Sequence, residues 1–352
     1  MDFNKQSILI AGPCSAESEE QMLQTAQVLG KQPVDILRAG VWKPRTRPNS
    51  FEGMGTPALK WLKKAGESIN KPVATEVANA KHVEEALKHG IDILWIGART
   101  TVNPFYVQEI ADALKGVNIP VMIKNPVNPD LSLWIGAIER IAHAGISNIA
   151  AIHRGFSTYK KTQYRNDPMW QIPIDLKIQL PDIPIICDPS HIGGKCEAIL
   201  EIAQKSIDLE MNGLMIETHI NPDEALSDAQ QQVTPAQLQK IIEQLNFRKS
   251  DEQSIANELN SLRNKIDALD EDILHFFKQR FELVEKIGEY KKEHQLTILQ
   301  LKRWEKILKT RTQWSENIGL NADFTKKLLE IIHNESIKIQ TNILNKNEQG
   351  NK

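Results

Sequence analysis

The sequence has few cysteines, no long apolar run and almost no net charge. Its three cysteines among 352 residues argue against a disulfide scaffold and for a reducing compartment. No apolar stretch approaches the ~20 residues that span a bilayer, and the beginning, MDFNKQSILIAGPC, does not resemble a signal peptide. A formal net charge of −2 gives no reason to expect nucleic acid or a membrane surface as a partner. We therefore expect a cytoplasmic protein.

Eight short apolar runs punctuate the first ~220 residues, with helix-like segments between them. Eight strand–helix units are typical of a (β/α)8 TIM barrel, whose active site lies at the carboxyl ends of its strands. The Thr-Pro start at 234–235 predicts a last barrel helix over 234–245. The runs are SILIAGPC, DILRAGVWK, VATE, ILWIGAR, VMIK, IAAIHR, IPIICDPSH and LMIET.

Gly and Pro nearly vanish after the barrel, so we expect a second domain of a different kind. We place the barrel at 1–247, a polar linker at 248–253 and an all-helical domain at 254–352. Apolar residues spaced by 4 and 3 from Ile255 to Phe276 predict a long helix over 254–293, followed by helices near 300–314 and 322–345. Such a helix cannot bury its apolar stripe alone, which predicts a dimer.

Positive side chains stand at or near the ends of most of the barrel's apolar runs. Cations buried beside strands need anionic partners, and arginine suits phosphate and carboxylate. We expect substrates that together carry at least two phosphates and a carboxylate, although any single cation is also compatible with pairing to a neighbouring acid or with solvent. The set is Arg38, Lys43, Arg45, Arg99, Lys124 and Arg154.

A second set combines one thiol, one imidazole and two carboxylates: Cys14, His191, Glu217 and Asp228. These groups form a mixed-ligand site for a divalent metal. They come from runs 1, 7 and 8 and from the loop after run 8, and the first and last strands of a closed barrel are neighbours. Taken singly, each also has a structural interpretation. Cys187 and Cys196 are expected to be structural, and His219 supports the metal site or is structural.

The motifs then become specific. AGPCSAES (11–18), RAGVWKPRT (38–46), IGART (96–100), MIKN (122–125), DPSH (188–191) and LSDAQQQ (226–232), with ATEV and ETH, together resemble type I 3-deoxy-D-arabino-heptulosonate 7-phosphate (DAHP) synthases. The resemblance covers about residues 7–245. The related KDO 8-phosphate synthases share the barrel and DPSH but lack KPRT, which makes them the weaker alternative.

The resemblance implies a role for each motif residue. Cys14, His191, Glu217 and Asp228 would bind a divalent ion, Mn²⁺ or a similar Fe, Co or Zn ion. Arg45 and Thr46 would bind erythrose 4-phosphate. Lys43 and Glu76 would be catalytic, as candidates for managing the proton of the water that adds to the substrate. The phosphoenolpyruvate site would comprise Arg38, Lys43, Arg99, Lys124 and Arg154.

Polar residues also stand on the apolar stripe of the helical region. Arg280 and Lys291 continue the stripe on one face, and Ser336 and Gln340 form an i, i+4 pair. Arg263 lies 17 residues before Arg280, ~26 Å along a straight helix, so it can complete such a pocket only from a second protomer. A coiled-coil register device or a surface arginine explains the spacing equally well.

Three segments, LNSLRNKIDALDEDIL, KQRFELVEKIGEYK and IIHNESIKIQ, resemble the domain-swapped dimeric chorismate mutases over about 254–345. The resemblance implies a cofactor-free conversion of chorismate to prephenate, with Lys291 and Gln340 stabilising the ether oxygen. The sequence departs from the family at Trp304, where an acidic residue that binds the substrate hydroxyl is common, and at Gln300. The implied site is Arg263 of the partner protomer, Arg280, Lys291, Arg303, Ser336 and Gln340.

The sequence thus predicts a bifunctional DAHP synthase and chorismate mutase. It also suggests that prephenate or chorismate, bound to the helical domain, inhibits the barrel. The alternative is an active barrel whose helical domain only binds a regulatory ligand and dimerises.

Overall fold

The computed structural model describes residues 3, 7–44, 50–159, 162–247 and 256–345. The chain divides into two compact units, Met1–Arg248 and Lys249–Lys352. The predicted linker 248–253 lies outside the described residues. No helix in the described part of the chain is both long enough and apolar enough to cross a bilayer.

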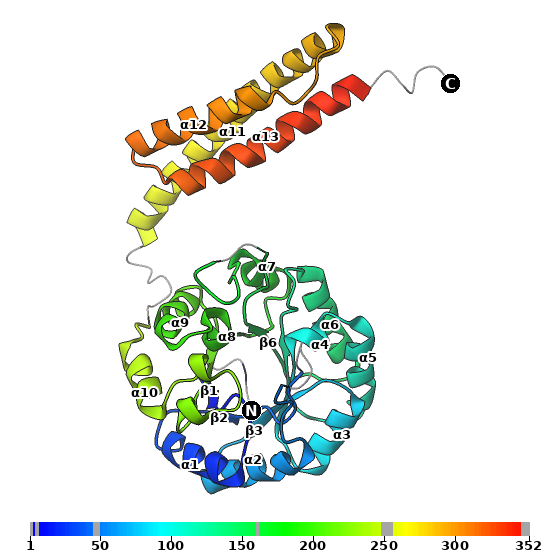
Figure 1. Ribbon diagram of the computed structural model, residues 1–352, viewed down its shortest axis with the longest axis vertical. Helices are drawn as coiled ribbons and strands as arrows, with labels where there is room; N and C mark the ends of the chain where they lie inside the picture. The colour runs from blue at the N-terminus through cyan, green and yellow to red at the C-terminus, as the bar shows by residue number, and fades with distance from the viewer. Residues whose placement is uncertain (1–2, 4–6, 45–49, 160–161, 248–255, 346–352) are drawn as a thin grey trace, which may run out of the picture. The chain divides into compact units, whose positions relative to one another are not determined.

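The first unit is a closed parallel barrel in which each strand pairs with the next and β8 pairs with β1 (Figure 1). The eight strands follow the eight apolar runs in order, which confirms the predicted fold. Their bounds are β1 Ile8–Gly12, β2 Ile36–Arg38, β3 Val73–Val77, β4 Ile93–Ile96, β5 Val121–Lys124, β6 Ile149–His153, β7 Ile185–Cys187 and β8 Gly213–Glu217.

Helices surround the strands, and several begin at capping residues that are evident in the sequence. The predicted last helix begins at a capping box in which the Thr234 side chain bonds the Gln237 amide, with Pro235 in the first turn. The helices are α1 Glu19–Leu29, α2 Thr56–Ser68, α3 Ala80–Lys88, α4 Ala98–Thr101, α5 Pro104–Ala113, α6 Leu131–His143, α7 Gln171–Gln179, α8 Pro189–Gly193, α9 Ile199–Asp208 and α10 Pro235–Gln244.

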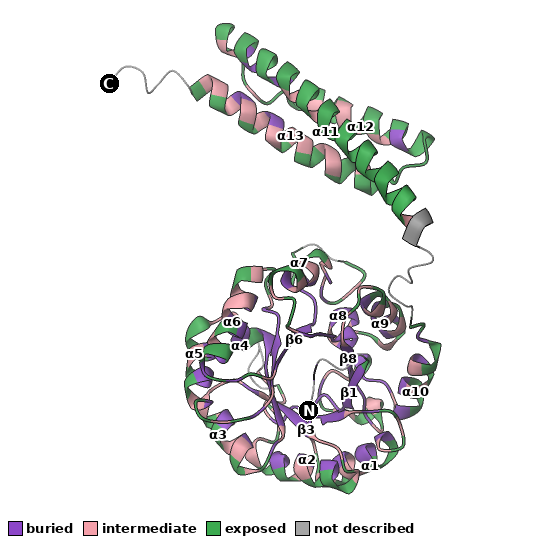
Figure 2. Ribbon diagram, turned by 180° about the vertical axis from the view of Figure 1, so that it is seen from behind, coloured by how far each residue is buried: buried purple, intermediate pink, exposed green. Residues whose placement is uncertain are grey.

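Strand side chains alternate between two cores. On β1, Ile8 and Ile10 point into a cluster that fills the barrel interior together with Trp95 and Met215, whereas Leu9 and Ala11 pack against the helices. Figure 2 shows the strands buried and the outward faces of the helices exposed. The filled interior leaves the ends of the barrel for ligands.

Strands β1 and β2 approach very closely where the first predicted site residues lie. Gly12 has φ +145°, and a Cβ there would stand 2.0 Å from the Arg38 carbonyl oxygen. Only glycine fits this approach. The absence of a side chain therefore lets the loop that carries Cys14 lie against the end of β2.

The second unit consists of three helices, α11 Ala256–Glu293, α12 Leu301–Asn317 and α13 Ala322–Asn345. The predicted helices match α11 and α13 closely. Helix α12 continues three residues beyond the expected 314 and ends just before Gly319, whose φ of +82° and hydrogen bond to the Glu316 carbonyl close the last turn.

Candidate functional site

The predicted barrel residues in the described ranges lie at the carboxyl ends of the strands. Arg38, Lys124 and Glu217 are the last residues of β2, β5 and β8, and Glu76 is the penultimate residue of β3. The remaining ones follow strands directly or lie in the first loop or short helix beyond: Cys14, Lys43, Arg99, Arg154, His191 and Asp228. Arg45 and Thr46 lie outside the described residues.

The four expected metal ligands form two close pairs. The Cys14 Sγ lies 3.4 Å from the Asp228 Oδ2, and the His191 Nε2 lies 3.8 Å from the Glu217 Oε1. The Lys43 ammonium lies 2.9 Å from the Cys14 sulfur. Residues separated by as many as 214 positions are thus brought to one side of the barrel mouth.

Within the described residues, no three Cys, His, Asp or Glu side chains are placed as a group that could hold a metal ion. The chemistry of the two pairs nevertheless fits a divalent cation, because thiolate, imidazole and carboxylate are its usual ligands. A positively charged group already lies on three of the four side chains: Lys43 on Cys14, Arg38 on Glu217 and Arg165 on Asp228. Their assembly around one ion stays a prediction.

Burial and charge act oppositely on these ligands. Burial and the nearby Glu217 raise the pKa of the Cys14 thiol to about 12. Burial also tends to raise the pKa of Glu217, but His191, Arg38 and Lys43 outweigh it and lower that pKa to about 2. The carboxylate is therefore ionised at neutral pH, whereas the thiol is ionised only when a bound cation stabilises its anion.

Several of the predicted anion-binding cations have partners within the protein. Arg38 lies 2.9 Å from Glu217, Lys124 lies 2.7 Å from Asp188, and Arg154 donates to Asn166 at 2.8 Å. The alternative of pairing with a neighbouring acid thus applies to Arg38 and Lys124. Each cation still has further N–H donors for a ligand.

Asp188 is a site residue that the sequence analysis missed. Its carboxylate is fully buried, accepts from Lys124 and lies 2.9 Å from the His191 Nδ1. It also caps α8, the short helix that carries His191. Asp188 directly follows β7, so the strand-end pattern that selected the other residues applies to it as well.

The Glu76 carboxylate is held by an aromatic residue inside the barrel. Its Oε2 accepts a hydrogen bond of 2.9 Å from the Trp95 indole, and the same ring lies 4.7 Å beneath the Arg38 guanidinium. A Cβ on Gly97 would stand 2.1 Å from the Glu76 Oε1. The glycine of the IGART motif therefore makes room for this carboxylate.

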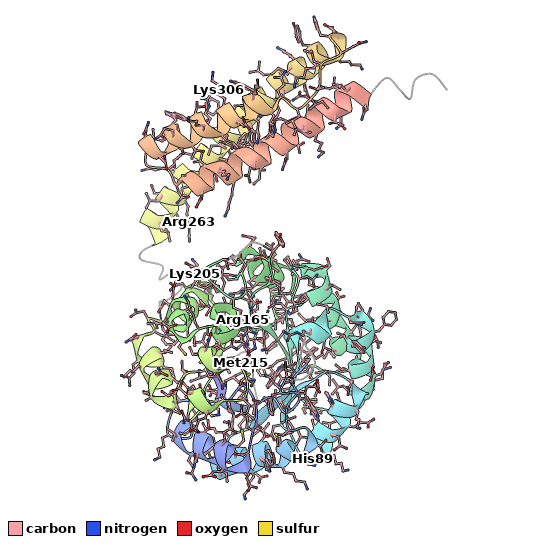
Figure 3. All side chains as sticks on the ribbon, in the orientation of Figure 1. His89, Arg165, Lys205, Met215, Arg263 and Lys306 are labelled. Carbon is pink, nitrogen blue, oxygen red and sulfur yellow. The ribbon has the colours of Figure 1, made fainter. Side chains whose placement is uncertain are left out.

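Arg165 is a second residue that sequence reasoning did not find. It donates to the Asp228 Oδ1 at 3.1 Å and to Gln231 at 2.6 Å, and Figure 3 labels it over the strands. Gln231 in turn donates to the Glu217 Oε2 at 2.6 Å. No apolar run precedes Arg165, so only the fold reveals its position.

The helical unit brings together part of its predicted site. The Arg280 guanidinium donates to the Ser336 hydroxyl at 2.9 Å, and the Gln340 amide donates to the Ser336 carbonyl at 3.2 Å. Lys291, also buried, donates to the Ile298 carbonyl. Lys291, Ser336 and Gln340 are buried in a unit whose large apolar residues are mostly exposed, whereas Arg280 is exposed in the single chain.

Two predicted residues do not join them within one chain. Arg263 is exposed on an early turn of α11, in the part of the helix that extends past α12 and α13 (Figure 3). Arg303 is exposed in the first turn of α12.

The position that departs from the mutase pattern has an aromatic partner. Trp304 stacks on His333 of α13, with ring centroids 3.9 Å apart and planes 7° apart. His333 is three residues before Ser336 on the same helix, a spacing that was available in the sequence but was not used.

Two family models match the chain. Residues 3–253 match the DAHP synthetase I family, and residues 262–341 match chorismate mutase type II. The phospho-2-dehydro-3-deoxyheptonate aldolase of Thermotoga maritima is 30% identical over 237 residues, which cover 67% of this chain and 68% of that protein. A 2-dehydro-3-deoxyphosphooctonate aldolase of Vesicomyosocius okutanii is 27% identical, and the alignment covers 69% of this chain and 91% of that protein.

Solved structures agree with these matches. The crystal structure of the Thermotoga maritima DAHP synthase aligns with a TM-score of 0.62 and 28% identity, over 73% of this chain and 70% of that one. A truncated form of the same enzyme aligns with a TM-score of 0.60 and 26% identity, over 73% and 88%. The chain belongs to the DAHP synthetase I family, and a chorismate mutase type II domain follows its barrel.

Proposed function

We propose that the barrel, residues 1–247, condenses phosphoenolpyruvate with erythrose 4-phosphate to DAHP and phosphate, and that the helical region, 254–352, converts chorismate to prephenate. One observation carries the first assignment. In a chain of this family, Cys14, Lys43 and Asp228 meet at the barrel mouth, close to the buried Arg38–Glu217 pair.

The cations at the mouth bind the two anionic substrates and place carbon C3 of phosphoenolpyruvate against the aldehyde carbon. Cys14, His191, Glu217 and Asp228 would hold a divalent ion, which supplies Lewis-acid polarisation of the aldehyde. Water then adds at C2, and phosphate leaves with cleavage of its bond to C2. The cations have to neutralise both substrates, which explains why their number exceeds the need of one phosphate.

Lys43 and Glu76 are the candidates for managing the proton of that water. Burial lowers the pKa of Lys43, but the nearby Cys14 and Glu217 raise it, and the net shift is upward. Glu76 also raises this pKa, to a smaller extent. Arg45 and Thr46, from the KPRT motif, are the proposed erythrose 4-phosphate ligands.

For the helical region, Arg280 and Lys291 would bind the carboxylates of chorismate, and Lys291 and Gln340 would stabilise the charge that develops on its ether oxygen. Ser336 holds the Arg280 guanidinium. Arg303 and the partner protomer's Arg263 would complete the cage. This reaction requires no cofactor.

We propose a homodimer formed through α11. Leu262, Ile266 and Leu269 on its apolar stripe are 51%, 56% and 61% exposed in one chain. A second copy of the helical region would cover this stripe and supply Arg263.

The fusion also suggests feedback control, in which prephenate or chorismate in the helical region inhibits the barrel. Prephenate should inhibit DAHP formation by the full chain but not by the Arg280→Ala variant. Equal inhibition of both proteins would contradict this control.

Phosphate release from phosphoenolpyruvate and erythrose 4-phosphate, before and after a chelator, tests the barrel assignment. We expect release to stop with the chelator and to return with Mn²⁺, Fe²⁺, Co²⁺ or Zn²⁺. Faster release with arabinose 5-phosphate would favour the KDO 8-phosphate synthase alternative, which the relatives of that activity support.

Turnover of chorismate by the full chain tests the second assignment. Binding without turnover would favour the alternative in which the helical region is only a regulatory and dimerisation module, and Trp304 is the feature that supports it. A cytoplasmic location fits the three free cysteines.

A further inference from the structure

The helical unit contains a buried imidazole nitrogen that lacks a partner. The Nε2 atom of His333 is shielded from solvent and has no hydrogen-bond partner among the described residues. Leaving a buried polar atom unpaired is unfavourable. This atom is therefore suited to a partner that the single chain does not supply.

His333 faces the same way as the proposed mutase residues of α13. It precedes Ser336 by three residues and Gln340 by seven, and such spacings place side chains on one face of a helix. Ser336 and Gln340 are buried, and Ser336 accepts a hydrogen bond from Arg280 of α11. His333 thus extends this polar row by one turn.

The charges around His333 indicate what kind of ligand would satisfy it. Burial, then Arg280 and then Lys291 lower the pKa of His333. Both cations belong to the proposed chorismate site. Because their charges act on the imidazole, His333 lies near that site. A neutral imidazole in this setting has one N–H with which to donate to an anionic ligand.

Trp304 holds the orientation of this ring. The indole from the first turn of α12 lies parallel to the imidazole, with 3.9 Å between centroids and 7° between planes. Turning the imidazole about its Cβ–Cγ bond would tilt the ring out of this contact. The stack therefore directs the edge of the imidazole that carries Nε2.

Building on the proposed mutase function, we propose that His333 is a substrate-binding residue: its Nε2 donates a hydrogen bond to an oxygen atom of the bound dicarboxylate, and Trp304 is the positioning residue that holds the ring. The usual acidic residue at position 304 is thus replaced by an aromatic pair whose polar end comes from α13.

The competing explanation is that the stack only joins α12 to α13. The His333→Phe variant of the full chain separates the two explanations, because phenylalanine keeps a ring against Trp304 and removes both nitrogens. We expect the KM for chorismate to rise about tenfold, the size of one lost hydrogen bond. The kcat should stay within about threefold, and the unfolding midpoint should not change.

His294→Phe is the matched control. His294 stacks on Tyr290, with centroids 4.0 Å apart, but it is exposed. This variant should keep the wild-type KM. His333→Gln retains an N–H donor and should have a KM between those of the wild type and His333→Phe, which keeps the proposal testable even where phenylalanine disturbs folding.

Trp304→Ala and the double variant with His333→Phe test the positioning role. If Trp304 acts through His333, the two effects on KM will not multiply. A wild-type KM in His333→Phe, together with a large loss in Arg280→Ala, would overturn the role of His333 and leave the mutase assignment intact. Absence of any chorismate binding or turnover by the wild-type chain would overturn both.

Discussion

The Arg38 guanidinium and the Glu217 carboxylate lie 2.9 Å apart, with only 1% and 0% of their side chains exposed. The pair connects the ends of β2 and β8, which lie on either side of β1. Glu217 has a second partner in Gln231, so one carboxylate connects strand, loop and proposed metal site.

Glu217→Gln should weaken both the fold and the synthase. Removing one charge from a buried pair costs about 3 kcal/mol of unfolding free energy, and the loss of a proposed metal ligand should lower activity about 100-fold. Urea unfolding and phosphate release measure the two effects. Asp112→Asn, which breaks an exposed pair with Lys115, is the control and should change neither. Full activity in Glu217→Gln would contradict the assignment of Glu217 as a metal ligand.

Asp188→Asn should lower the affinity for metal about 10- to 100-fold, because Asp188 orients the His191 ring. Excess metal should restore part of the synthase activity of Asp188→Asn, whereas it should not restore the activity of His191→Ala. A metal titration of phosphate release distinguishes the two variants. If Asp188→Asn required no more metal than the wild type, the orienting role would be wrong.

Cys14→Ser should weaken metal binding and make the synthase less sensitive to peroxide, since the thiolate is the group that is oxidised. Cys196→Ser is the control, because its sulfur contacts the carbonyls of Gln230 and Gln232, and Cys196 is not one of the proposed ligands. Peroxide inactivation is followed for the wild type and both variants. Loss of peroxide sensitivity in Cys196→Ser alone would contradict the assignment.

His153 should make the barrel less stable as the pH falls. Burial and the Arg154 charge lower its pKa to about 3, below the unfolded value of about 6.5. The unfolded chain therefore binds the proton first. The contribution of neutral His153 to the unfolding free energy is therefore complete above about pH 6.5. It falls as the pH drops toward about 3, by up to about 1.4 kcal/mol per pH unit.

Urea unfolding between pH 7 and pH 5 tests this expectation. His153→Leu should show a shallower decline of unfolding free energy than the wild type, whereas His143→Leu, at an exposed site on α6, should keep the wild-type slope. Parallel slopes for all three proteins would rule out His153 as a source of the pH dependence.

Mixing two inactive variants should restore mutase activity if the site is shared between protomers. In a heterodimer of Arg263→Ala and Arg280→Ala chains, one of the two sites receives both arginines, so random exchange restores about one quarter of all sites. Chorismate turnover after unfolding and refolding the mixture measures this. Absence of recovery in mixed, folded dimers would show that Arg263 acts within its own chain.

The order of the barrel strands could be predicted from sequence because each strand lies in a short apolar run, and most of these runs have a charged residue at or near their end. The same pattern also predicted Lys124 and Glu217 as site residues, which are the last residues of β5 and β8. It would have found Asp188 if every polar residue directly after a run had been counted.

Other contacts depend on closure of the barrel and leave no local pattern. Arg165 and Gln231 are 66 positions apart, and Trp95 reaches Glu76 from the neighbouring strand. In the helical unit, the sequence indicates only that Trp304 stands where an acidic group is common. Only its packing on His333 shows where a replacement polar atom lies.

The pairing of β1 with β8, from Ile8 with Gly213 to Gly12 with Glu217, has a consequence for biosynthesis. On the ribosome, the first strand is made early but has no final neighbour on one side until more than two hundred further residues have been added. Contacts so distant along the chain form slowly. Closure of the cylinder must therefore follow synthesis of its last strand.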